Sequence, residues 1–166
     1  DAKPQAVFLF LPAGEQGIAF MKGFKERGLA DAGIKLIATG DITDDSVLEA
    51  MGDSTLGLIT SFHYSAAHDS PENKTFIKAY ADANGTKMRP NFMAAAAYDG
   101  MAAIYAALKA TGGSTDGDKL MAAFKGMKID SPRGPIMIDP ETRDVVQTIY
   151  IRKVEKAGGG VQNVEI

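Results

Sequence analysis

His63 and His68 are the side chains of this sequence with the widest range of possible chemistry. Their spacing of five residues places them on no common helical face and matches no usual zinc pattern, so we expect no metal site there. They follow an apolar segment, Leu56 to Phe62, which is typical of a buried strand. We therefore predict a ligand-binding loop at the end of this strand, formed by Phe62, His63 and Tyr64.

Asp41, Asp44 and Asp45 form the other cluster that could hold a cation. Their spacing is not that of a calcium loop, and the pattern predicts instead that this segment caps a short helix from Val47 to Met51. Arg133 lies between two prolines and has two interpretations. It either clamps a carboxylate or supports a hairpin.

The sequence lacks the recognised patterns of catalysis. It has no cysteine, no GxSxG elbow, no P-loop and no GxGxxG fingerprint, so we expect binding without enzyme activity and without a cofactor. The net charge of −3, without a cluster of Lys or Arg, argues against nucleic acid as a partner. No apolar stretch approaches the roughly 18 residues that a membrane span needs. We therefore expect a small-molecule ligand and no direct membrane insertion.

A strand, a tight loop and a helix are predicted at the start of the chain. The apolar run from Ala6 to Leu11 suggests a strand buried on both faces of a sheet, and the apolar spacing after Glu15 changes to that of a helix. Ligands bind at the carboxyl ends of parallel strands, where free backbone N–H groups converge. The candidate ligand-binding residues of this loop are Ala13, Gly14, Glu15 and Gln16.

The strand and helix pattern then repeats. Gly33 to Thr39 is predicted to be the second strand, and Leu56 to Phe62 the third. Thr39 and Asp41 come at the end of the second strand and are candidate ligand contacts for the same reason. Ser70, Pro71 and Glu72 predict the start of a further helix, which ends at Asn84 and Gly85.

The second half of the chain has a different character. Ala94 to Ala110 is an alanine-rich helix whose broad apolar face predicts burial, and a shorter helix follows at about Asp118 to Phe124. Pro135 to Asp139 and Val145 to Val154 predict an antiparallel hairpin. The glycine-containing tail from Ala157 to Ile166 is expected to be loosely held.

Taken in order, the motifs VFLFLPAG, GIKLIATGD, GLITSFHYS, AYDGM and GPIMIDPETRD resemble the periplasmic solute-binding proteins of ABC importers. The similarity runs from Ala6 to about Glu155. Within this class of proteins, the sequence more narrowly resembles the branched-chain amino acid (Leu/Ile/Val) type. It implies a type I α/β fold, in which doubly wound parallel-sheet lobes close on a small ligand, with a C-terminal antiparallel hairpin. The resemblance covers only the second half of that family.

The resemblance therefore implies an incomplete two-lobe fold. Residues 1–91 and 148–166 would form the second lobe without its first strand and helix, and residues 92–147 would supply helices and a hairpin to the first lobe. The alanine-rich helix would then expose an apolar face, to be covered by another chain or by crystal contacts.

The resemblance also implies a function and leaves the ligand open. The protein would be the substrate-binding component that captures a solute between two lobes and delivers it to a permease in the inner membrane, in the periplasm of a Gram-negative bacterium. The position of the ligand tyrosine in leucine-binding members falls on Pro12 or Ala13, and that of the acid near Gly40 and Asp41. Both a branched-chain amino acid and an aromatic acid remain possible ligands. The alternative is a ligand-sensing lobe of a receptor or regulator.

Overall fold

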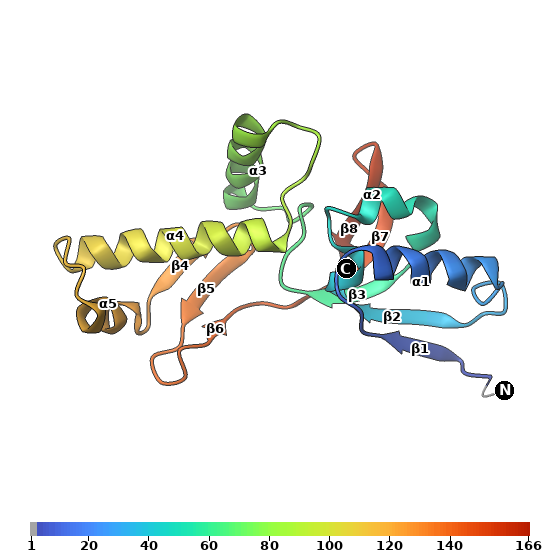
Figure 1. Cartoon of the computed structure of the whole chain (residues 1–166), viewed down its shortest axis with the longest axis horizontal. Coiled ribbons are helices and arrows are strands. Elements are labelled where there is room, and N and C mark those ends of the chain that lie inside the picture. The colour runs from blue at the N-terminus through green and yellow to red at the C-terminus, as the bar shows by residue number, and fades with distance from the viewer. Residues whose placement is uncertain (1–2) are drawn as a thin grey trace.

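The computed structural model describes residues 3–166 and contains two β-sheets at opposite ends of an elongated molecule (Figure 1). The larger sheet has the strand order β1-β2-β3-β7-β8. Its strands are β1 (Ala6–Leu9), β2 (Lys35–Thr39), β3 (Ile59–Phe62), β7 (Tyr150–Ala157) and β8 (Gly160–Glu165). The smaller sheet joins β4 (Lys128–Ser131), β5 (Gly134–Ile138) and β6 (Val145–Val146).

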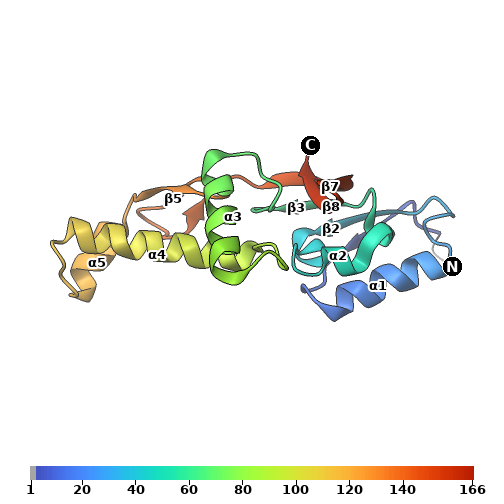
Figure 2. The same cartoon turned by 90° about the horizontal axis from the view of Figure 1, so that it is seen from above.

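The first three strands are parallel, as the alternation of strand and helix predicts. β1 pairs with β2 and β2 with β3, whereas β7 joins β3 in the antiparallel direction. The connections contain α1 (Glu15–Glu26), α2 (Leu48–Met51) and the 3-10 turns η1 (Gly40–Thr43) and η2 (Gly52–Thr55). Both α1 and α2 lie on the same side of this sheet (Figure 2).

The main core lies between the sheet and these helices. Its fully buried members include Ala38, Ile42, Leu48 and Val154, with Met21 supplied by α1. The burial of one face of each strand against helices is the packing expected of an α/β layer.

The other face of the sheet is exposed, which corrects the prediction that the strand at Ala6 is buried on both faces. Phe8 and Phe10 are 69% and 72% exposed, and Ile37 is exposed beside them. Within residues 3–166, helices cover only the side that holds α1 and α2, so alternate residues of β1 and β2 have no apolar layer against them.

The smaller sheet packs against α4 (Phe92–Ala110) and α5 (Gly117–Phe124), and α3 (Pro71–Asn84) stands between the two parts of the molecule (Figure 1). The side of α4 that carries Ala95, Ala103 and Ala107 is buried. The opposite side exposes Met101, Ile104 and Tyr105. The burial predicted from the broad apolar face of this helix is therefore observed only on one side, and the exposed apolar face implied by the family resemblance is observed on the other.

The predicted hairpin is present only in part, with Met137 paired to Val146 and Ile138 to Val145. The rest of its predicted second strand is wrong, because Tyr150–Ala157 forms β7 of the larger sheet. The sequence reading did not identify β4, which pairs with the other side of β5. The predicted loose tail is wrong, because β8 pairs with β7 from Gly160 to Glu165. Val161 and Asn163 of β8 are buried, so apolar packing and hydrogen bonds both hold this strand.

Helix caps agree with the sequence in part. Ser70 caps α3, because its hydroxyl accepts a hydrogen bond from the N–H of Asn73 at 3.1 Å. The predicted side-chain cap of the helix near Val47 is wrong: α2 has no such cap, and Asp44 accepts instead from the N–H of Ser46 at 3.0 Å. No helix among residues 3–166 combines the length and the apolar character required to cross a membrane.

Candidate functional site

The carboxyl ends of β1, β2 and β3 meet at one edge of the larger sheet. The register pairs Leu9 with Ala38 and Thr39 with Ser61, so the loops that follow these strands are neighbours. The antiparallel β7 begins at the same edge, where Tyr150 is paired with Phe62. We call this the strand-end edge. All three segments predicted to bind ligand begin here.

The first segment is the turn that enters α1. Ala13 and Gly14 are half-buried, and Glu15 and Gln16 are exposed. Gly14 adopts φ 122° and ψ −153° and gives the helix no side-chain cap. The first N–H groups of a helix have no partner within the helix and carry a partial positive charge. This turn is therefore suited to a carboxylate.

The second segment follows β2. Thr39 is the last residue of the strand, and the half-buried Asp41 lies in the turn η1. The buried Oγ1 of Thr39 has no hydrogen-bond partner among residues 3–166. This hydroxyl and the Asp41 carboxylate are the polar side-chain groups that the segment brings to the strand-end edge.

The third segment provides aromatic rings. The ring centroids of Phe62 and His63 are 4.5 Å apart, and Phe92, the first residue of α4, lies 5.0 Å from Phe62 in an edge-on arrangement. His63 and Phe92 are 5.8 Å apart and nearly perpendicular. We call these three residues the aromatic cluster. The cluster is suited to an apolar or aromatic ligand group.

The electrostatic surroundings of His63 favour a neutral imidazole. Burial lowers the pKa of His63 from its usual value, and the positive charges of Arg133 and Arg152 lower this pKa further. The carboxylate of Asp41 acts in the opposite direction. A neutral ring can both donate and accept a hydrogen bond, which suits recognition of a ligand hydroxyl.

The side chain of Tyr64 does not lie at the strand-end edge with those of Phe62 and His63. Its side chain is 1% exposed, and its hydroxyl donates to Oδ1 of Asn73 in α3 at 3.1 Å. Burial raises the pKa of this phenol far above its ordinary value. The structure therefore brings Phe62 and His63 to the strand-end edge but places the hydroxyl of Tyr64 in the core beside Phe76.

Asp44, Asp45 and the second histidine have partners within the protein. Asp45 is buried and accepts from the N–H of Ala66 at 3.2 Å, and burial raises its pKa. His68 lies 2.8 Å from a carboxylate oxygen of Glu165. Residues 3–166 contain no group of three or more His, Cys, Asp or Glu side chains placed to hold a metal.

Arg133 supports the hairpin. Its Nε donates to Asp99 of α4 at 2.8 Å, both side chains are buried, and Nη1 donates to Gln147 at 2.6 Å. Ser131 donates to the same Asp99 oxygen at 2.9 Å. Of the two interpretations of Arg133, the structure favours scaffolding, because its fork is directed at protein acceptors.

Two residues of this region, Phe92 and Arg152, were not predicted from the sequence. Phe92 reaches the aromatic cluster through the tertiary fold, and no local sequence pattern predicts this contact. Arg152 lies beneath the cluster, with its guanidinium carbon 5.0 Å from the centre of the Phe62 ring. Its signal was available: it occupies the same face of a predicted strand as Val154, and a charged residue at such a position needs buried partners.

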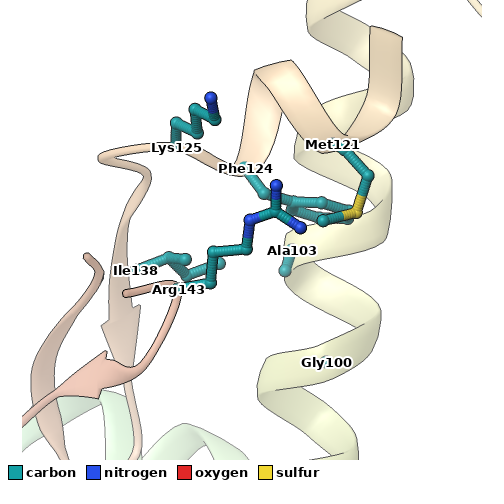
Figure 3. Close-up of a pocket in the computed structure, with 7 residues that line it drawn as sticks. All are labelled: Gly100, Ala103, Met121, Phe124, Lys125, Ile138 and Arg143. Atoms are coloured by element: carbon teal, nitrogen blue, oxygen red, sulfur yellow. The ribbon is translucent and has the colours of Figure 1, made fainter. Parts of the chain in front are cut away.

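A separate apolar pocket of about 280 Å³ lies between α4, α5 and the hairpin. Figure 3 shows the side chains of Met121, Phe124 and Ile138 around it, with Arg143 reaching across. It contains none of the predicted ligand residues and belongs to the part of the molecule that is remote from the strand-end edge.

The fold is that of an α/β protein in which three parallel strands of a mixed sheet end at one edge. A family model described as periplasmic binding protein matches residues 1–159. The chain therefore belongs to the periplasmic binding protein family, as its motifs predict.

Relatives and solved structures agree with this assignment. A Leu/Ile/Val-binding protein homolog 6 from Brucella melitensis is 47% identical over 160 residues, which are 96% of this chain and 41% of that protein. A solute-binding protein of an ABC transporter from Rhodopseudomonas palustris BisB5, solved in complex with 3,4-dihydroxybenzoic acid, is 58% identical with a TM-score of 0.92. The match covers 99% of this chain and 45% of that one.

A second solute-binding protein, from Rhodopseudomonas palustris HaA2 in complex with p-hydroxybenzoic acid, is 44% identical with a TM-score of 0.90. That match covers 98% of this chain and 44% of the other. This chain thus spans less than half the length of the relatives it matches. The predicted fold class is confirmed by these structures.

Proposed function

We propose that this chain is part of the substrate-binding component of an ABC importer, and that its ligand is an aromatic carboxylate of the hydroxybenzoate type. The observation that carries the proposal is the aromatic cluster of Phe62, His63 and Phe92 at the strand-end edge. Solved relatives at 58% and 44% identity hold hydroxylated benzoic acids, which supports the same class here.

The residues at the edge divide the work of recognition. Phe62 and Phe92 form an apolar wall for the ligand ring, and His63 offers a neutral nitrogen to a ring hydroxyl. The turn from Ala13 to Gln16 offers backbone N–H groups and one amide side chain to polar ligand groups. Thr39 supplies a hydroxyl.

Asp41 separates this ligand class from an amino acid. A branched-chain amino acid has an α-ammonium group, and Asp41 is the half-buried carboxylate of the strand-end edge suited to pair with it. An aromatic carboxylate has no cation, so Asp41 then serves the turn η1 alone. The resemblance to Leu/Ile/Val-binding homologues keeps the amino acid as the rival ligand.

The two sheets support a division of the chain between two lobes. Residues 1–91 and 148–166 belong to one lobe, and residues 92–147 belong with the N-terminal lobe that longer relatives possess. The exposed apolar faces at Phe8 and Met101 are suited to packing against that further protein.

Capture requires no chemistry. An open hinge admits the ligand, contacts with both lobes favour the closed state, and the permease recognises that state. Because the matching family model is that of a periplasmic binding protein, we also propose a periplasmic location.

Calorimetric titration of the intact natural protein with 4-hydroxybenzoate and with leucine tests this function. We expect binding of 4-hydroxybenzoate without turnover, and unchanged affinity in an Asp41→Asn variant. A protein that binds leucine, and loses that binding in Asp41→Asn, would show that the amino acid is the ligand. Formation of a product from either compound would contradict capture.

A further inference from the structure

Arg152 is a buried cation in the middle of β7. Its side chain is 1% exposed, the lowest exposure of any arginine or lysine described in the core. Burial lowers its pKa to about 10, and the nearby carboxylates of Asp45 and Asp44 act against this shift, so the guanidinium stays charged at neutral pH. A buried charge persists only where protein groups replace the water it has lost.

The acceptors of Arg152 come from the ends of two other strands. Nη1 donates to the carbonyl of Tyr64 at 2.5 Å, and Nη2 donates to the carbonyl of Gly40 at 3.3 Å. Both Nε and Nη2 also reach Oγ1 of Thr60, at 3.3 and 3.1 Å. Gly40 follows Thr39, and Tyr64 follows His63. One guanidinium therefore joins the two segments that carry the predicted ligand contacts after β2 and β3.

The same guanidinium supports the aromatic cluster. Its central carbon lies 5.0 Å from the centroid of Phe62, within range of a cation–π contact. Phe92 contacts the Phe62 ring edge-on at 5.0 Å. The Phe62 ring is therefore held by Arg152 in addition to its aromatic neighbours.

Gly40 closes this arrangement. A Cβ atom at Gly40 would lie 2.2 Å from Cγ of Phe62 and 2.4 Å from Nη2 of Arg152. Contacts of that length do not occur between real side chains, so only glycine fits between the ring and the guanidinium. The position of Phe62 is thus set by backbone on one side and a fixed cation beneath it.

We propose that Arg152 is a positioning residue of the ligand site, which fixes the Phe62 ring and the ends of β2 and β3 and thereby sets the affinity for an aromatic ligand. It acts through Phe62 and the two carbonyls, without contact to the ligand. This proposal rests on the proposed function, and it adds a residue outside the three predicted segments.

The first test is an Arg152→Lys variant of the intact natural protein. It is titrated with 4-hydroxybenzoate at a temperature well below the midpoint of its thermal unfolding. Lysine keeps the charge but loses the fork that joins Gly40 to Tyr64. We expect affinity to fall about tenfold, equivalent to one hydrogen bond to a charged group. Lys153→Met is the matched control, because Lys153 is the next residue and its ion-pair partner within residues 3–166 is the partly exposed Glu155. Its affinity should be unchanged.

A double-mutant cycle separates positioning from general stability. If Arg152 acts through Phe62, Arg152→Lys should weaken binding by less than about twofold when Phe62 is already replaced by Leu. Fully additive losses from the two substitutions would overturn the proposal, because they would show that Arg152 acts independently of the ring.

If Arg152→Lys does not fold, a further variant tests whether Arg152 positions the ligand site. Thr60→Val preserves shape but removes the hydroxyl acceptor that Nε and Nη2 share, while Nη2 keeps the carbonyl of Gly40, and we expect about threefold weaker binding. Unchanged affinity in Thr60→Val, or in a folded Arg152→Lys, would overturn the positioning role of Arg152 and leave the proposed function intact. A wild-type protein that binds no aromatic acid would instead overturn the proposed function and, with it, this inference.

Discussion

The hydroxyl of Tyr150, the first residue of β7 in the larger sheet, donates at 2.9 Å to the backbone carbonyl of Arg133, in the turn between β4 and β5 of the smaller sheet. This hydrogen bond crosses between the two parts of the molecule. Gly134 leaves room for it, because a Cβ there would lie 2.6 Å from the Tyr150 oxygen. The contact therefore lies at the junction about which the proposed lobes would move.

Replacement of Tyr150 by Phe removes the hydroxyl and leaves the ring in place. We expect a loss of about 1 kcal/mol in the free energy of unfolding, since the carbonyl of Arg133 loses its donor. Chemical denaturation measures this loss. Tyr80→Phe is the control, because Tyr80 is half-buried on α3, outside the apolar face of α4 that the further lobe would cover, and its replacement should change stability by less than about 0.5 kcal/mol. Equal effects at the two positions would show that the Tyr150 hydrogen bond does not stabilise the junction.

Replacement of Asp99 by Asn tests the buried ion pair with Arg133. Removal of one partner leaves a buried charge without compensation, so we expect a loss of about 3–5 kcal/mol in unfolding free energy. Asp82→Asn breaks the exposed pair with Lys78 on α3 and should cost less than about 1 kcal/mol. Similar costs for the two variants would contradict the scaffold role of Arg133.

The lowered pKa of His63 gives a pH dependence whose sign is fixed. Because the folded-state pKa lies below the unfolded value of about 6.5, the unfolded state binds more protons between these two values. The contribution of His63 to stability is therefore fully present above about pH 6.5 and falls as the pH drops through that value. The melting temperature of His63→Asn should fall less than that of wild type between pH 7.5 and 5, because the variant lacks the proton that His63 takes up on unfolding. Parallel curves for the two proteins would contradict the shift.

Hydrogen exchange tests the order of the C-terminal strand. The amides of β8 that pair with β7 should exchange slowly, because Val161 and Asn163 are buried and Asn163 donates to the carbonyl of Thr43 at 2.8 Å. The exposed turn at Gly158 and Gly159 should exchange fast and serves as the internal reference. Fast exchange along all of β8 would restore the prediction of a loose tail.

The parallel strands and their helices could be predicted from sequence because each has a local signal. The apolar runs before Pro12, Thr39 and Phe62 are followed by polar or glycine-containing turns, and strand ends in such a fold share an edge. The family resemblance added the fold class, which the solved relatives confirm.

Other features depend on tertiary contacts that no local pattern encodes. Phe92 joins Phe62 only after α4 is placed, and Tyr64 leaves the strand-end edge because Asn73 of α3 binds its hydroxyl. The C-terminal tail was predicted to be loose because of its glycines, but Gly158 and Gly159 form the turn between β7 and β8, and the buried Asn163 helps to hold β8. Burial of both faces of β1 was expected from its apolar sequence, but burial depends on what packs against that strand.

The dissociation constants of 3,4-dihydroxybenzoate and of leucine for the intact natural protein, measured side by side by calorimetry, test the central claim most directly. The aromatic cluster and the carboxylate-suited turn of α1 predict saturable binding of 3,4-dihydroxybenzoate, and affinity for leucine at least about a hundredfold weaker, a difference of roughly 2.7 kcal/mol. Tighter binding of leucine, or no binding of the aromatic acid, would contradict the account.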